Sequence, residues 1–249
     1  MTTTPVVDFH THIGRFGYLA MDDDPDRFLR IMDAAGVDIA CVFCIWYGDF
    51  IRGNDITAQY VSRHPDRFVG AGYISPAYPE DTIAELERIF DKLALKFLKL
   101  YPRFTAAKVL DDDAYIPILE WANDRGIVIM SHHDDWPKPL KYINLARQFP
   151  NVKWVISHGG NGLLAQQEAV EAAQTTPNIF LEISTSWGDH KTIQFLTEGA
   201  GDDRLLFGSD MPEQDVRHHI GRVLTADIPN ESKRKILGLN AAKLLGISV

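Results

Sequence analysis

The strongest constraint on the fold is a regular alternation of short apolar runs and longer amphipathic stretches along the 249 residues. Eight runs have the length and the β-branched or aromatic content of buried strands, namely Val6–His12, Ile39–Ile45, Phe68–Ile74, Phe97–Tyr101, Ile127–Ser131, Val152–Ser157, Ile179–Ile183 and Leu205–Gly208. A stretch with helical periodicity follows each run, and these stretches are Pro25–Ala35, Ile56–His64, Glu80–Leu93, Ala114–Asp124, Leu140–Gln148, Leu163–Thr175, Lys191–Glu198 and Val216–Leu224. Two further helices are expected at Glu231–Leu237 and Ala241–Leu245.

Strict βα alternation predicts a parallel sheet in which each helix crosses over between neighbouring strands. Eight such units in ~250 residues match the size of a closed barrel. We therefore predict an α/β protein, a (β/α)8 TIM barrel that forms a single domain over residues 1–249. The alternative is an open doubly wound sheet, which would normally carry a glycine-rich phosphate turn after its first strand. The segment Phe9–Gly14 at that point is not such a turn.

Composition excludes several classes of protein. Hydrophobic residues make up 45% and charged residues 24%, which is typical of a globular chain. A net charge of −9 argues against binding to nucleic acid or to a membrane surface through bulk charge. The longest apolar stretch, Ile39–Tyr47, is far shorter than the ~20 residues that span a bilayer. No signal peptide is visible and two cysteines build no disulfide framework, so a cytoplasmic location is expected.

Polar side chains gather where the predicted strands end, which is the face that carries the active site in barrels of this type. The first strand ends in His10-Thr11-His12, the fourth carries Lys99 and Tyr101, the fifth is followed by His132, the sixth by His158 and the eighth by Asp210. Side chains alternate along a strand, so His10 and His12 point the same way. Closure of the barrel would pair the eighth strand with the first and bring Asp210 beside them.

Neutral imidazoles and a carboxylate suit a borderline divalent ion such as Zn²⁺, with one coordination position left for water. We therefore predict one bound metal ion, most readily Zn²⁺, with Mn²⁺ as the alternative. His10, His12 and Asp210 would meet around it, and His132 would approach from across the mouth. The competing interpretation is that the histidines are buried residues satisfied by hydrogen bonds.

The same residues resemble the amidohydrolase superfamily, specifically its amidohydrolase-2 branch. The matching segments follow the family's order and cover nearly the whole chain; they are VVDFHTHIG, KFLKLYP, GIVIMSHH, KWVISHGG, LLFGSDMP and ILGLNAAKLLGI. The resemblance implies that His10, His12, His132 and Asp210 are metal ligands. It also implies that His158 is a catalytic histidine beside the metal, or a ligand in a second arrangement, and that Asp210 accepts a proton from the metal-bound water.

The role of Lys99 is open at this point. In relatives with two metals a lysine of the fourth strand bridges the ions, whereas one metal is usual in the branch resembled here. Lys99 is therefore predicted as a substrate contact or a buried ion-pair partner.

Arginine recognises carboxylates through paired hydrogen bonds, and aromatic walls bind flat molecules. The predicted loops contain residues of both kinds, and we choose Arg52 and Trp187, with Tyr101 and Lys99, as substrate contacts; the others are Arg15, Arg103, Trp46, Tyr47 and Trp136. The alternative is that these side chains are solvated or pack between loops.

The sequence favours a metal-dependent hydrolase of a small carboxylated molecule such as a lactone or an amide. A non-oxidative decarboxylase of the same family is the alternative. A TatD-like phosphodiesterase is less favoured, because the glutamate it needs on the third or fourth strand is missing from FVGAGYIS and FLKLYP. The fourth hypothesis is a barrel without catalytic activity that is stabilised by a closed structural metal site. The only partner expected is the substrate, with a homo-oligomer left open.

Several residues invite a function that the pattern does not support. Cys41 and Cys44 lie three apart on a predicted strand and so face opposite sides, which favours buried core cysteines over a metal site. Surface positions are expected for the histidines on or beside helices, which are His64, His190, His218 and His219.

Overall fold

The computed structural model describes residues 4–14, 24–45, 48–102, 109–132, 139–184 and 191–249. Eight parallel strands form one sheet in sequence order, from β1 to β8. Their bounds are β1 Val7–His12, β2 Ile39–Phe43, β3 Phe68–Tyr73, β4 Phe97–Leu100, β5 Val128–Ser131, β6 Lys153–Ile156, β7 Ile179–Glu182 and β8 Leu205–Leu206. The order matches the predicted alternation.

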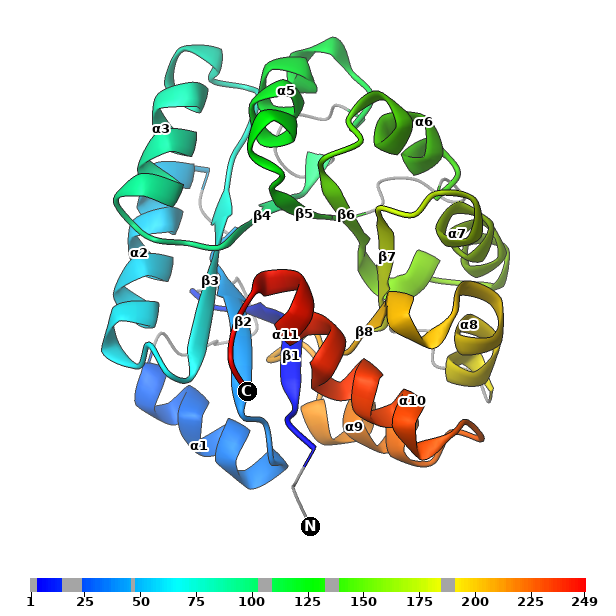
Figure 1. Ribbon diagram of the computed structural model, residues 1–249. Coiled ribbons are helices and arrows are strands. Elements are labelled where there is room, and N and C mark those ends of the chain that lie inside the picture. The colour runs from blue at the N-terminus through cyan, green and yellow to red at the C-terminus, as the bar shows by residue number, and fades with distance from the viewer. Residues whose placement is uncertain (1–3, 15–23, 46–47, 103–108, 133–138, 185–190) are drawn as a thin grey trace.

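Helices surround the strands as an outer ring (Figure 1). They are α1 Pro25–Ala35, α2 Phe50–Arg63, α3 Pro79–Asp91, α5 Ile116–Arg125, α6 Lys141–Gln148, α7 Leu163–Thr175, α8 Thr192–Ala200, α9 Val216–Leu224, α10 Asn230–Arg234 and α11 Asn240–Leu245. Short turns of other helical types are η1 Asp113–Tyr115, η2 Ser157–Gly160, η3 Asp202–Arg204 and the π-helical η4 Lys235–Leu239. Helix α11 lies over the near end of the barrel beside β1, which it contacts.

Backbone hydrogen bonds between β1 and the chain after β8 close the sheet. The Phe9 amide donates to the Phe207 carbonyl at 2.9 Å, and the His12 amide donates to the Met211 carbonyl at 2.7 Å. The Asp210 amide donates to the carbonyl of His10 at 2.9 Å. The protein is therefore a (β/α)8 TIM barrel, and closure sets Asp210 directly beside the His-x-His segment, as predicted.

The core consists of side chains inside the barrel and between the strands and helices. Phe9, Phe43, Phe97 and Trp154 are among the largest buried side chains. Cys41 and Cys44 are buried and form no disulfide, which confirms their assignment to the core. No helix in the described parts of the chain is long and apolar enough to cross a bilayer.

Helix α2 shows where local patterns misplace a boundary. The sequence predicts a helix from Ile56, but the helix begins at Phe50, because the Asp49 side chain accepts a hydrogen bond from the Arg52 amide and caps it. Gly53 weakens the helical pattern of this first turn in the sequence. A methyl group at Gly53 would lie 2.6 Å from the Cys44 carbonyl oxygen, so close packing on the end of β2 requires glycine there.

Candidate active site

Three ligand atoms from the two chain segments that close the barrel converge on one point. His12 Nε2 lies 3.0 Å from Asp210 Oδ1, and His10 Nε2 lies 3.2 Å from the same oxygen. The two Nε2 atoms are 3.3 Å apart, and all three side chains are buried. Imidazole nitrogen and carboxylate oxygen are the donors that Zn²⁺ and similar divalent ions bind. The residues present therefore fit a divalent cation.

The charge state of the cluster agrees with this fit. Burial, together with the nearby Lys99 ammonium group, holds the pKa of His10 well below its ordinary value. A neutral imidazole is the form that offers a lone pair to a metal. Burial by itself would raise the pKa of Asp210, but His10 and His12 hold that pKa well below its ordinary value, so the carboxylate is ionised.

Two of the predicted site residues have strained backbones. His158 has a φ of 62° and Asp210 a φ of 64°, in the left-handed region that residues with a Cβ seldom adopt. Such strain persists only where the surrounding structure enforces it, and it is concentrated at functional sites. The observation supports a functional role for both residues.

His132 and His158 form a second pair next to the first cluster. His158 Nε2 lies 3.2 Å from His132 Nδ1, and the His158 ring centroid is 5.0 Å from that of His10. The Tyr101 ring lies 4.2 Å from the His132 ring, centroid to centroid. The fold thus brings His10, His12 and Asp210 together as predicted, whereas His132, also predicted as a ligand, lies against His158 and is not among the ligand atoms that converge in the described residues.

Lys99 is fully buried on β4 and faces the cluster. Its Nζ lies 3.1 Å from Ser157 Oγ and 3.4 Å from His10 Nε2. Burial lowers the pKa of Lys99 to about 8. The inward orientation follows the predicted alternation on this strand, whereas contact with substrate stays a prediction.

The sequence places Asp8 beneath the two histidines of the first strand, but sequence reasoning missed a second acid behind them, Glu182. Glu182 at the end of β7 lies 2.6 Å from His10 Nδ1 and is completely buried. Asp8 accepts hydrogen bonds from the Ser209 amide at 2.9 Å and the Ser209 hydroxyl at 2.5 Å. A signal for Glu182 was available in the sequence, because it is an acid inside the otherwise apolar run Ile179–Ile183. An acid in a buried strand is expected to have a partner.

The structure also corrects the prediction for His219. It was predicted on the surface, but its side chain is only 2% exposed on the inner face of α9. His219 Nε2 lies 2.8 Å from Gln214 Oε1, and Arg222 Nη1 lies 3.3 Å from His219 Nδ1. His64, in contrast, is partly exposed and lies 2.9 Å from Asp26 Oδ1.

The predicted substrate contacts are described only in part. Arg52 lies in the first turn of α2 with its side chain exposed. Trp187 lies outside the described residues, and so do the other loop residues considered from the sequence, which are Arg15, Trp46, Tyr47, Arg103, Trp136 and His190.

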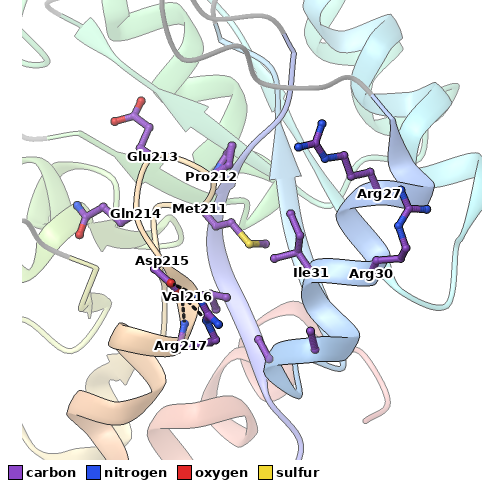
Figure 2. A pocket seen from close by; sticks show the side chains of 12 residues that line it. Arg27, Arg30, Ile31, Met211, Pro212, Glu213, Gln214, Asp215, Val216 and Arg217 are labelled. Carbon is purple, nitrogen blue, oxygen red and sulfur yellow. Dashed lines mark hydrogen bonds and ion pairs between the residues drawn. The ribbon is translucent and has the colours of Figure 1, made fainter.

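A surface cleft of about 620 Å³ opens beside the segment that follows Asp210. Figure 2 shows Arg27, Arg30 and Ile31 of α1 on one side and the chain from Met211 to Arg217 on the other. None of the converging histidines lines this cleft. The cleft therefore lies next to the cluster.

Comparison with known proteins supports the family predicted from the motifs. Residues 7–247 match the family model described as Amidohydrolase. A 2-amino-3-carboxymuconate-6-semialdehyde decarboxylase of Dictyostelium discoideum is 24% identical over 235 residues, covering 78% of this chain and 65% of that protein. The match thus spans less than two thirds of the length of this curated relative.

Solved structures show the same fold. The 5-carboxyvanillate decarboxylase of Sphingomonas paucimobilis superposes with a TM-score of 0.81 at 19% identity, covering 99% of this chain and 100% of that one. A dihydroxybenzoic acid decarboxylase of Polaromonas sp. JS666, solved with bound manganese and 2-nitroresorcinol, gives 0.79 at 17% identity, covering 98% and 97%. From the family match over nearly its whole length, the chain belongs to the amidohydrolase family.

Proposed function

We propose that this protein is a metal-dependent, non-oxidative decarboxylase of a small carboxylated molecule. The observation that carries the proposal is the convergence of His10 Nε2, His12 Nε2 and Asp210 Oδ1 within 3.3 Å, with His158 beside them. The three relatives named above are decarboxylases, which supports this reaction class over the hydrolase that the sequence ranked first.

His10, His12 and Asp210 would hold the cation. A divalent ion bound there would supply a Lewis acid that draws electron density from a substrate oxygen. The donor set favours zinc, and manganese is the ion named for the Polaromonas relative. We propose a single ion, with His132 as a fourth predicted ligand.

Decarboxylation breaks the bond between a substrate carbon and its carboxylate and forms a C–H bond at the same carbon. The electron pair of the broken bond stays on the substrate, carbon dioxide leaves, and one proton must be delivered. We assign the delivery to His158. Its Nδ1 lies 2.9 Å from the Ser184 carbonyl oxygen, so Nε2 is the atom that exchanges a proton with a molecule in the site.

Recognition of the substrate would rest on the predicted contacts. The Lys99 ammonium group gives the buried floor a positive charge, and the Tyr101 ring beside His132 offers a flat wall. Arg52 and Trp187 are the predicted contacts from the loops. Together they favour a planar, unsaturated carboxylate over a neutral lactone.

The test combines metal analysis with product analysis on the purified full chain. Protein loaded with zinc or manganese is incubated with carboxylated enols, 5-carboxyvanillate, 2,6-dihydroxybenzoate, lactones, amides and a phosphodiester. Release of carbon dioxide from a member of this panel is the expected result. Acid formation without carbon dioxide would instead identify the hydrolase, and phosphodiester cleavage the nuclease.

A substitution at the proposed metal site tests the assignment, and the same substitution at an exposed position is the control. Asp210→Asn removes one charged ligand atom and is expected to abolish turnover. Asp227→Asn makes the same chemical change at an exposed position and is expected to leave turnover unchanged. Full activity of Asp210→Asn would contradict the proposed site.

A further inference from the structure

We infer that the end of strand β7, from Glu182 to Ser184, is a positioning element that fixes which ring nitrogen carries the proton in both His10 and His158. It makes both imidazoles present Nε2 to the shared centre. The inference rests on the metal centre proposed above and extends it to residues that neither hold the ion nor touch the substrate.

The Glu182 carboxylate is placed to accept hydrogen bonds on both oxygens. Oε1 accepts from the Ser184 amide, and Oε2 accepts from the Ser184 hydroxyl at 2.9 Å and from the His158 amide at 3.3 Å. His10 Nδ1 lies 2.6 Å from Oε2. Because backbone N–H groups already donate to both of its oxygens, the carboxyl group is placed as an acceptor, and His10 Nδ1 carries the proton and donates it. The lone pair of the neutral ring is then on Nε2, the atom that faces Asp210.

His158 is fixed by the same segment in a different way. Its Nδ1 lies 2.9 Å from the backbone carbonyl oxygen of Ser184 and 3.1 Å from the Ser184 hydroxyl oxygen. A carbonyl oxygen cannot donate, so His158 Nδ1 must carry a proton. The Nε2 atom of His158 is left to face the site, where it lies 3.2 Å from His132 Nδ1.

A glycine on the neighbouring strand end leaves room for this carboxylate. A methyl group at Gly208 would overlap Glu182 Oε1 and would lie 2.9 Å from His10 Cβ. Both groups that it would displace belong to the Glu182–His10 contact. Gly208 therefore gives an independent way to disturb the contact without changing any charge.

Loss of this support has a predictable cost. Partners behind a metal-ligating histidine fix its tautomer and ring orientation, and their replacement typically lowers metal affinity by about 10- to 100-fold. Glu182→Gln places an amide N–H₂ against the N–H groups of Ser184 or of His10 and His158. Ser184→Ala removes only the hydroxyl and keeps the carbonyl, so we expect a smaller loss.

The experiment titrates Zn²⁺ alone against the full chain in competition with a chelator. Glu182→Gln and Gly208→Ala are both expected to weaken zinc binding by about 10- to 100-fold. Glu171→Gln, an exposed acid on α7, and Gly221→Ala, where a methyl group meets nothing within 4 Å, are the matched controls.

A second readout separates positioning from simple loss of stability. The ¹⁵N shifts of the histidine rings, assigned through His10→Gln and His158→Gln, report which nitrogen is protonated in the zinc-loaded protein. We expect an Nδ1–H pattern for His10 in the parent, and a loss of this pattern in Glu182→Gln at unchanged circular dichroism. If Glu182→Gln does not fold, Gly208→Ala supplies the same comparison.

The outcomes distinguish the two proposals. A parent chain that binds no zinc and no manganese would refute the proposed metal centre. A parent that binds zinc, with Glu182→Gln and Gly208→Ala within about twofold of it, would overturn the positioning role alone. An Nε2–H pattern for His10 in the zinc-loaded parent would do the same.

Discussion

Acid sensitivity of the fold should depend on His219, a buried histidine outside the proposed metal site. Burial is the main cause, and the Arg222 guanidinium adds to it; together they lower the pKa of His219 to about 4. Glu182 and Asp210 act weakly in the opposite direction. Protonation would also place a second N–H at Nδ1 against the Arg222 Nη1 donor, which lies 3.3 Å away.

The sign and size of the effect follow from the pKa in the two states. Unfolded histidine has a pKa of about 6.5, so between about pH 6.5 and 4 the unfolded chain binds the additional proton. Stability linked to His219 is therefore complete above pH 6.5 and is lost as the pH falls toward 4. One pKa unit is worth ~1.4 kcal/mol, so the free energy of unfolding should fall by about 2 kcal/mol between pH 7 and pH 4.5 through this residue.

Denaturant unfolding of the parent and of His219→Gln at both pH values measures how much His219 contributes to the change in unfolding free energy. The variant should lose about 2 kcal/mol less than the parent on acidification. His218→Gln is the matched control, because His218 is the exposed neighbour on the same helix. Equal losses in the parent and in His219→Gln would refute the reasoning.

Three other perturbations test the packing and the proposed centre. Gly72→Ala would place a methyl group 2.5 Å from Ile89 Cγ2 and is expected to lower the unfolding free energy by about 1–3 kcal/mol. Gly48→Ala, whose methyl group would meet nothing within 4 Å, should lower it far less. Denaturant midpoints of the two variants make the comparison. Ser209→Ala removes the hydroxyl that donates a hydrogen bond to the buried Asp8 side chain, and it should destabilise the protein by about 1–3 kcal/mol in the same assay. A chelator should lower the thermal midpoint of protein loaded with zinc, and re-addition of zinc should restore it; an unchanged midpoint would argue against a bound ion.

Much of the fold could be predicted because its signals are local. Helices α1, α7 and α9 begin and end where the sequence predicts, since amphipathic periodicity and capping residues act within one or two turns. Alternation along a strand fixed the shared direction of His10 and His12. In a barrel of parallel strands, the carboxyl ends of all strands lie on one face, so the side chains at these ends could be placed together.

Other features depend on contacts between residues far apart in the chain. The contact between His10 and Glu182 joins residues 172 positions apart, and the hydrogen bond between Ser209 and Asp8 joins residues 201 positions apart. Local patterns carry no information on the register that brings such atoms within 3 Å. The burial of His219 likewise depends on which face of α9 meets the barrel.

The sequence by itself determined the order of strands and helices, the family, and the residues that supply imidazole and carboxylate groups to the mouth of the barrel. Only the tertiary structure decided which of those atoms meet and which groups stand behind them, such as Glu182 behind His10. The physical reason is that closure of the sheet and side-chain packing set distances of a few ångströms between segments that are remote in the chain.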